Sequence, residues 1–477
     1  MAHEAVAVEQ YPVDAPLAER PPGRLSWFEG FVLSLTMPAA LIATLGYSIS
    51  SLGTWLAIAL WGVSMVLATL ANRAYAELAG MFPEKQGIAL YASEGWRSRF
   101  SLAGPIAAFG YWFAWSSSMA VYSGIVGSLV QAQWFSSQDW VWDLGIVDVT
   151  FARLVAALVL VAVWAANILG LRPTLWLAYT AAAMLVVPLA VFMFLPYLTG
   201  DWSSATFTDP TGDWRLAVVW LYIMCWTSLG VEVCATFTPE YRNGSRDAAK
   251  ALRAAALFSL AVFVLLPLGA AGTVGEPAID ADPLTFYVPA FQELVGGADD
   301  VMVALIVGSL LLVIVTAMAD SSRALFGMSK DGTTVRGLDR LNRFGVPGRA
   351  ITADLLVNLA LLFFLGSILA IVAAGNLGYV AAHVFALTAL LLLRRDRPRW
   401  SRPFRLGRPM VVVVGGLAAF LAFLCVVGAT SFELTGYGGW RELAIALGIL
   451  LGSVLLYAFR RIVQDGEPLR LREESRG

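Results

Sequence analysis

Charged residues are scarce in this chain. Asp, Glu, Lys and Arg make up 14% of its 477 residues, against about 25% in a typical soluble domain. Hydrophobic residues reach 58%, and apolar runs recur from residue 28 to residue 459, each about 20 residues long and therefore able to cross a bilayer. This composition excludes the soluble globular class. We interpret the chain as an all-α protein that crosses a membrane many times.

Histidine and cysteine are also rare. The only histidines are His3 and His383, and the three cysteines all lie inside apolar runs. Neither residue type shows the spacing of a metal site or of a disulfide framework. An intramembrane enzyme would need paired metal ligands or a nucleophile with an orienting base. The sequence therefore disfavours an enzyme and predicts neither a metal nor any other cofactor, apart from a coupling ion.

The apolar runs predict about twelve membrane spans between two polar tails. Residues 1–27 contain no apolar core followed by a cleavage site, so we expect a disordered cytoplasmic tail there and a second cytoplasmic tail at 461–477. A turn at Gly375 is expected to separate the ninth span from the tenth. The predicted spans are 29–48, 55–78, 104–130, 151–169, 174–198, 215–238, 251–274, 301–323, 350–373, 376–394, 410–429 and 441–459.

Loop charges predict how the chain is oriented. The loops after spans two, six, eight and ten are basic, whereas those after spans three, five and seven are acidic. Because basic loops stay on the cytoplasmic side, we expect both termini inside, in a plasma (inner) membrane. The basic loop at 395–408 is suited to anionic lipid headgroups, and we expect no nucleic-acid binding.

Two predicted spans contain a helix-breaking interruption. In the sixth, Thr227, Ser228 and Gly230 precede Glu232 in an otherwise apolar run. Gly costs about 1 kcal/mol in a helix interior, and a carboxylate at membrane depth costs about 2.5 kcal/mol or more. In the first, within 36–40, Pro38 lacks the N–H that a helix needs. Interruptions at matching places of two halves indicate a transporter of two inverted repeats, with its site at the midplane.

Four further stretches carry a recognisable pattern in chain order. They are Tyr75-Ala76-Glu77-Leu78-Ala79 with Phe82-Pro83, Gly87 and Tyr91; Leu229-Gly230-Val231-Glu232 with Pro239-Glu240, Arg242-Asn243 and Arg246; Ser322-Arg323 with Asp331-Gly332 and Val346-Pro347; and Arg394-Arg395 with Pro398 and Arg402-Pro403-Phe404. Together they resemble the signature segments of the amino acid–polyamine–organocation (APC) superfamily of permeases, amino acid permease type.

This resemblance implies a leucine-transporter-type fold. Two inverted five-helix repeats would occupy 28–198 and 215–394, with two peripheral helices at 409–460. The breaks in spans one and six would bind the carboxylate and amine of a substrate, since helix N-termini attract anions. An aromatic residue four before Gly230 would cover the substrate. The residues implied to bind it are Met37, Pro38, Ala39, Ala40, Trp226, Thr227, Ser228 and Gly230.

Two features depart from the family pattern. The first break usually reads Gly-Ser/Ala-Gly, whereas Pro38-Ala39-Ala40 stands here and offers fewer N–H donors to a carboxylate. A different amine is therefore an alternative to an α-amino acid. Some proton-driven members carry a lysine in span five, but no Lys or Arg lies between Thr174 and Pro196.

Candidates for coupling to an ion gradient are Glu232, Thr316, Asp320 and His383. Glu232 either accepts hydrogen bonds from backbone N–H groups freed by the break or contacts the substrate. Asp320 either pairs with Arg323 on its own helix or forms a proton or Na⁺ site with Thr316. His383, expected in the outer half of span ten, is either a packed core residue or a proton relay.

We therefore predict a secondary transporter for amino acids or closely related amines. It is expected to work by alternating access with proton-coupled uptake. An exchanger and a transporter-like sensor are the alternatives, and both a monomer and a homodimer fit the sequence. The aromatic cluster at 111–115 is interpreted as packing against the bundle and lipid, with the alternative that one member, which the sequence does not identify, faces the pathway.

Overall fold

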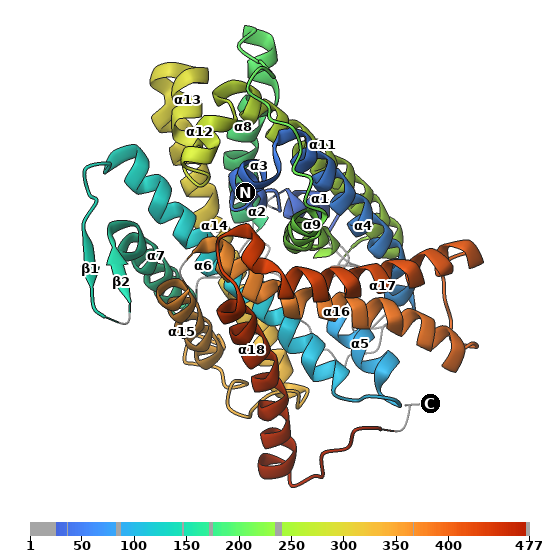
Figure 1. Cartoon of the computed structure of the whole chain (residues 1–477). Helices are drawn as coiled ribbons and strands as arrows, with labels where there is room; N and C mark the ends of the chain where they lie inside the picture. Colours follow the sequence, from blue (N-terminus) through green and yellow to red (C-terminus); the bar gives the residue numbers. More distant parts are fainter. Residues whose placement is uncertain are drawn as a thin grey trace, which may run out of the picture.

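The structure is a computed structural model that describes residues 25–35, 37–82, 87–145, 147–170, 175–233, 241–365 and 367–473. Nearly all of the ordered elements in these ranges are helices (Figure 1). The helices are α1 (Trp27–Ser34), α2 (Ala39–Ile42), α3 (Leu45–Leu52), α4 (Thr54–Met81), α5 (Ile88–Trp96), α6 (Ala103–Trp134), α7 (Phe151–Ile168), α8 (Leu175–Thr199), α9 (Trp214–Ser228), α11 (Ser245–Val274), α12 (Glu276–Ala281), α13 (Tyr287–Val295), α14 (Asp299–Lys330), α15 (Gly348–Phe364), α16 (Ile368–Asp396), α17 (Arg408–Thr430) and α18 (Trp440–Phe459).

Short irregular helices and one hairpin complete the described elements. The 3-10 helices are η2 (Leu229–Glu232), η4 (Gly296–Ala298) and η5 (Phe432–Thr435), and the π-helical turn η6 (Arg460–Gln464) follows α18. Strands β1 (Val141–Asp143) and β2 (Asp148–Thr150) pair antiparallel, with Val141 opposite Thr150. The hairpin joins α6 to α7 and was not expected from the sequence.

The described helices confirm a polytopic all-α membrane protein. Ten are long and apolar enough to cross a membrane, and the pair Trp27–Ile42 and Leu45–Leu52, bent by 46°, gives an eleventh. The 17 residues of α15 reach the lower end of the spanning length. With α15 as the twelfth, the number matches the prediction. The two tails and the division into inverted repeats stay predictions.

Helix burial separates an inner set of helices from an outer one. In α6, 83% of the apolar stretch is buried, and the value is 72% for α9 and for α16, but only 22% for α7 and for α18. Figure 1 shows α6 passing through the middle of the molecule, with α17 and α18 on the outside. The residues that can enclose a site therefore come chiefly from α6, α9 and α16.

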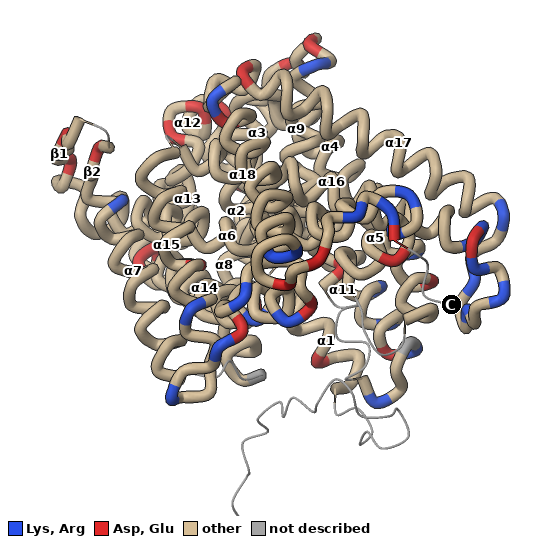
Figure 2. Tube along the Cα trace, turned by 90° about the horizontal axis from the view of Figure 1, so that it is seen from below, with Lys and Arg blue, Asp and Glu red and all other residues tan. Residues whose placement is uncertain are grey.

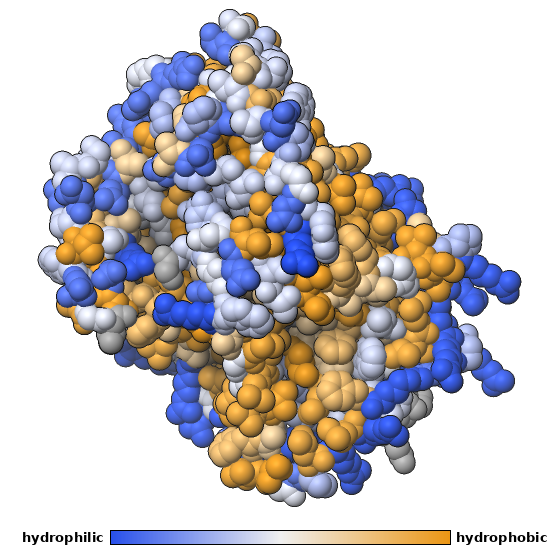
Figure 3. Space-filling model, viewed as in Figure 1, coloured by the Kyte–Doolittle hydropathy of each residue, from blue (hydrophilic) through white to orange (hydrophobic). Residues whose placement is uncertain are grey.

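The outer helices present an apolar surface to lipid. On α18, Leu447, Leu451 and Leu455 are all exposed, and their four-residue spacing places them on one face. Figure 3 shows hydrophobic side chains spread over the side formed by α16, α17 and α18. Figure 2 shows acidic residues on β1, β2 and α12, and Lys and Arg at the far end of α17 and around α14. This segregation follows the loop charges on which the orientation was predicted.

The predicted turn at Gly375 is wrong. Helix α15 ends at Phe364 and α16 begins at Ile368, so Gly375 is inside α16. A Cβ at Gly375 would lie 2.7 Å from Oγ of Ser117, and a Cβ at Gly378 would lie 2.7 Å from Cα of Gly110. Both glycines therefore allow α16 and α6 to approach closely. Their function is close helix packing rather than chain reversal.

A buried ion cluster joins two of the signature stretches on the side of the basic loops. The Glu77 side chain is fully buried on α4, and it accepts hydrogen bonds from Nε (2.8 Å) and Nη2 of Arg394 on α16. Arg402 lies within 3.4 Å of the same carboxylate, and the backbone N–H of Leu406 donates to it at 2.8 Å. These stretches therefore hold α4, α16 and the following loop together.

A second carboxylate, that of Glu276, links separate chain segments at the opposite end of the helix bundle. Glu276 at the start of α12 accepts hydrogen bonds from the backbone N–H of Thr54 (2.7 Å) and from the N–H (2.8 Å) and hydroxyl (2.5 Å) of Thr208. Burial alone would raise the pKa of this carboxyl, but the hydrogen bonds from Thr208 and Thr54 outweigh it. The pKa of Glu276 therefore lies below its ordinary value of 4.5.

Candidate functional site

The first span is interrupted where Pro38 predicts it. Helix α1 ends at Ser34, and α2 starts at Ala39 with Pro38 as its N-cap. Between them the backbone makes three-residue turns, in which Met37 N–H donates to Ser34 O and Ala40 N–H donates to Met37 O. Thr36 lies outside the described residues. The prediction of a broken helix is confirmed, because the backbone hydrogen bonds at the break do not follow the regular α-helical pattern.

The sixth span changes its winding at the predicted glycine. The α-helix α9 ends at Ser228 and continues as the 3-10 helix η2, Leu229–Glu232. The tighter 3-10 winding changes the direction of successive side chains. The interruption therefore starts at Leu229, slightly later than the predicted Thr227. Pro239 and Glu240 of the signature stretch lie outside the described residues.

A small cavity lies where the two interruptions meet. Its volume is about 30 Å³, enough for about two water molecules, so the surrounding helices must separate before a solute can enter. The cavity is lined by Met37 and Ala40 from the first break, Trp226, Thr227 and Gly230 from the second, Ala114, Trp115, Ser118 and Tyr122 from α6, and Tyr379 from α16.

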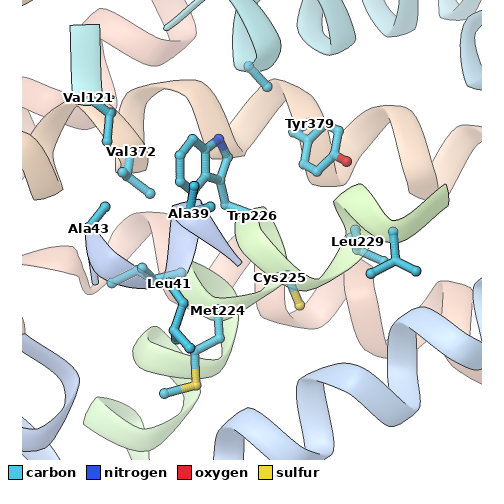
Figure 4. Close-up of a cluster of buried hydrophobic side chains, with 14 of the residues drawn as sticks. Ala39, Leu41, Ala43, Val121, Met224, Cys225, Trp226, Leu229, Val372 and Tyr379 are labelled. Carbon is cyan, nitrogen blue, oxygen red and sulfur yellow. The ribbon is translucent and has the colours of Figure 1, made fainter. Parts of the chain in front are cut away.

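Five of the eight predicted binding residues line this cavity. Pro38, Ala39 and Ser228 are buried but are not part of the lining. Pro38 acts instead as the N-cap that starts α2. Figure 4 shows Trp226 on α9 and Tyr379 on the neighbouring α16. Trp226 lines the cavity, and its role as an aromatic cover over the substrate stays a prediction.

The α6 side of the cavity was not predicted from the sequence. Trp115 belongs to the aromatic cluster that was interpreted as packing, and Ser118 and Tyr122 follow it on the same side of α6. The run of three serines at 116–118 in an apolar span was a signal for a polar interior. It could not be assigned, because α6 is buried on nearly every side.

The cavity wall combines aromatic rings with unpartnered polar groups. Trp115, Tyr122, Trp226 and Tyr379 supply four rings, and no charged side chain is among the described residues that line it. The hydroxyl of Thr227 and the indole N–H of Trp115 are buried and have no hydrogen-bond partner in the part of the chain that the structure describes. Aromatic faces attract ammonium groups, and unpartnered buried donors are costly unless a ligand engages them. This wall suits a small solute that carries an amine and a hydrogen-bond acceptor.

Glu232 lies next to the cavity, in a shell of tyrosines. Its Oε1 accepts hydrogen bonds from the hydroxyls of Tyr111 on α6 (2.7 Å) and Tyr379 on α16 (3.3 Å), and the side chain is buried. The described hydrogen bonds to this carboxylate thus come from tyrosines, whereas backbone N–H groups were expected. Tyr379 touches both the cavity and Glu232.

His383 is brought to the same place. Its Nε2 lies 3.9 Å from Oε2 of Glu232, and the ring is fully buried. It occupies the middle of α16 (Ile368–Asp396). The predicted position in the outer half was wrong, because the helix begins eight residues earlier than Asn376.

Asp320 and Thr316 do not join this cluster. Asp320 forms the intrahelical ion pair with Arg323 (3.6 Å), and its side chain is 68% exposed. The Thr316 hydroxyl donates to the carbonyls of Leu312 and Val313 in its own helix. The ion pair is therefore the alternative that the structure supports, and an ion site on α14 stays a prediction.

A further buried acid was missed altogether. Asp354 on α15 is fully buried, and its Oδ1 accepts hydrogen bonds from the hydroxyls of Ser116 on α6 (2.7 Å) and Ser321 on α14 (2.9 Å). Asn358 donates to Ser116 at 3.1 Å. Its acidity in the apolar span 350–373 was the available signal. The cluster joins three helices away from the cavity.

The known proteins to which this chain is similar are permeases and transporters. Residues 25–454 match the family model described as amino acid permease. The uncharacterized amino acid permease YvbW of Bacillus subtilis is 22% identical over 358 residues, covering 72% of this chain and 77% of YvbW. The glutamate/serine transporter AimA of the same organism is 24% identical over 403 residues, covering 76% and 70%. The polyamine transporter PUT1 of Oryza sativa subsp. japonica is 26% identical over 415 residues, covering 84% and 71%. All three are named as permeases or transporters, not as enzymes.

Proposed function

The chain belongs to the amino acid permease family of the APC superfamily, and from this premise we propose that it takes up amino acids or closely related amines across the plasma membrane by proton-coupled alternating access. The names of its relatives support amino acids or polyamines as substrates. Both termini are placed on the cytoplasmic side, following the basic loops.

The aromatic cavity between the two broken spans is the observation that carries this proposal. An ammonium group would rest against the rings of Trp226 and Tyr379, while a carboxylate would take up the unpartnered Trp115 N–H and Thr227 hydroxyl. Only uncharged side chains line the described cavity, so a solute with one ammonium suits it better than a polyamine with several.

The small volume of this cavity supports alternating access. A volume of about 30 Å³ is too small for a solute, so binding requires the broken segments α1–α2 and α9–η2 to move relative to α6 and α16. These segments are the expected moving parts, because transporters with broken helices work by rocking one group of helices against the rest around the site. Exchange of one solute for another is the second candidate, and it needs the same cavity without a driving ion.

Flux measurements in proteoliposomes test the proposal. We expect at least one member of a radiolabelled panel of neutral, acidic and basic amino acids and of putrescine and spermidine to accumulate, and an inward proton gradient to increase that accumulation. Flux that requires solute on both sides and ignores the gradient would favour the exchanger. Binding without flux of any member would contradict transport and favour a sensor.

Thr227→Val provides the matched site variant. It removes the unpartnered hydroxyl at constant shape, and the loss of one neutral hydrogen bond, about 0.5–1.5 kcal/mol, should weaken solute binding by about 2- to 10-fold. Thr69→Val is the control, because the Thr69 hydroxyl donates to Met65 O within α4 and lies outside the cavity. Equal affinities in both variants would remove Thr227 from the site.

A further inference from the structure

Two buried polar atoms face each other beside the cavity, and each lacks a partner. Oε2 of Glu232 and Nε2 of His383 are 3.9 Å apart, and neither forms a hydrogen bond with any residue that the structure describes. The side chains are 1% and 0% exposed. Buried polar atoms in native proteins are almost always paired. A separation about 1 Å longer than a hydrogen bond closes with a small side-chain movement, once a proton makes the contact favourable.

Tyr75 restricts the protons of the imidazole. Its hydroxyl on α4 lies 2.6 Å from Nδ1 of His383, so that ring nitrogen is engaged and only Nε2 faces Glu232. The other oxygen of Glu232 is already held by Tyr111 and Tyr379. Within this cluster, an added proton can therefore be accommodated between Oε2 and Nε2. Oε2 accepts a hydrogen bond there, and Nε2 either accepts or donates one, depending on the tautomer of the imidazole.

Charge explains why a proton is required. With Glu232 ionised and His383 neutral, the cluster carries one negative charge, and among the described ion pairs His383 is the only partner of Glu232. The other titratable groups that face the pair are Tyr75, Tyr111 and Tyr379, with Tyr91 stacked on Tyr75 at 6.5 Å. Tyrosines are neutral near pH 7. An unpaired charge at membrane depth is costly, and one proton removes it.

We propose that Glu232 and His383 form one proton-binding pair, which takes up a single proton between Oε2 and Nε2 and couples transport to the proton gradient. The proton comes from hydronium in the aqueous phase, which is left as water; no other bond forms or breaks, and the cluster changes from one net negative charge to none. The coupling role rests on the transport function proposed above, whereas the proton binding does not. The pair would be the proton-coupling group of this chain, in place of the lysine that some proton-driven family members carry in span five.

The pair is mechanically connected to the cavity at two points. Glu232 is two residues after Gly230, which lines the cavity, and both belong to the 3-10 helix η2. Tyr379 lines the cavity and also donates to Glu232. A solute that displaces Tyr379 or η2 thereby alters how the carboxylate is held. By linkage, the factor by which a bound solute changes the proton affinity of the pair equals the factor by which protonation changes the solute affinity.

Proton binding can be tested without any solute. In purified protein reconstituted in lipid, infrared difference spectra recorded across pH should contain a protonated-carboxyl band that disappears in Glu232→Gln and persists in Asp354→Asn. In His383→Gln, which keeps a polar group opposite Glu232 but cannot titrate, the midpoint of that band should move by about one pH unit or more, the size expected for coupled groups. An unchanged midpoint would overturn the pair.

A second variant keeps the test decisive if His383 variants do not fold. Tyr75→Phe removes only the hydroxyl that engages Nδ1, and it should also move the midpoint. Tyr91→Phe is the matched control, because Tyr91 stacks on Tyr75 but has no contact with the histidine among the described hydrogen bonds, and it should leave the midpoint in place. Equal spectra in the two variants would contradict a role for the imidazole.

The coupling role has its own readout. With whichever panel solute is transported, His383→Gln should abolish accumulation driven by a proton gradient and retain solute exchange. Loss of both activities in a folded variant, or retention of both, would contradict coupling through this pair. If no panel solute is transported, the infrared titration still decides whether the pair binds a proton, so the two proposals fail separately.

Discussion

Replacing Glu77 by Gln should lower the free energy of unfolding by about 3–5 kcal/mol, the range measured when one partner of a buried ion pair is removed. The Glu77 side chain is 0% exposed, and its partners Arg394 and Arg402 are 16% and 4% exposed. Gln keeps the shape and one acceptor, but it leaves two buried guanidinium groups without a counter-charge. The loss should therefore exceed that of a simple hydrogen bond, about 1 kcal/mol.

A thermodynamic cycle in lipid bicelles, read by steric trapping, measures this loss. Glu77→Gln, Arg394→Gln and the double variant are compared, and the double variant should lose less than the two single losses combined, because it leaves fewer charges uncompensated. Asp396→Asn is the control. It breaks the ion pair with Arg99 at the end of the same helix, where the side chains are 31% and 32% exposed, and exposed pairs contribute about 0–1 kcal/mol. Equal losses in Glu77→Gln and Asp396→Asn would refute the reasoning from burial.

Three further perturbations follow from single contacts. Gly375→Ala should destabilise the protein by about 1–3 kcal/mol, measured by thermal unfolding, because its Cβ would lie 2.7 Å from Ser117 Oγ. Gly230→Ala should leave that stability nearly unchanged, since its Cβ meets no atom closer than 3.5 Å, yet reduce solute uptake by filling the cavity. Because the pKa of Glu276 is lowered in the folded state, its ionised carboxylate stabilises the fold fully above the ordinary pKa of 4.5, and this contribution disappears as pH falls through the lower native pKa. Glu276→Gln should therefore flatten the acid side of the stability profile, and an unchanged slope would contradict this.

Local sequence features predicted the breaks correctly because their causes are local. Pro38 cannot donate to a helical hydrogen bond, and Gly230 followed by Glu232 weakens a membrane helix wherever it occurs. The ion cluster of Glu77 with Arg394 was not predicted as a contact, although both residues belong to the signature stretches. The two residues are separated by 317 positions in the chain, so their contact depends on how distant helices pack.

The remaining site residues were not predictable for the same physical reason. Gly375 was taken for a turn, because glycine at a chain reversal and glycine at a close helix contact are identical in sequence. His383 and Tyr75 are separated by 308 positions, so neither residue indicates the other. Trp115 could not be distinguished from its aromatic neighbours, since α6 is surrounded by other helices and has no polar face to orient it.

Asp354 provides a test of which buried acid takes part in coupling. Its described partners, Ser116 and Ser321, lie on α6 and α14, neither of which is interrupted, whereas Glu232 lies on the broken sixth span. Movement of the broken segments should therefore change the surroundings of Glu232 and leave those of Asp354 intact. Asp354→Ala strands two buried hydroxyls and should cost about 1–3 kcal/mol in unfolding free energy, while Asp354→Asn, which keeps the acceptor, should cost less. In Asp354→Asn the number of protons moved per solute should equal that of the unmodified protein; a changed ratio would place Asp354 in the coupling pathway and would mean that uninterrupted helices also rearrange during transport.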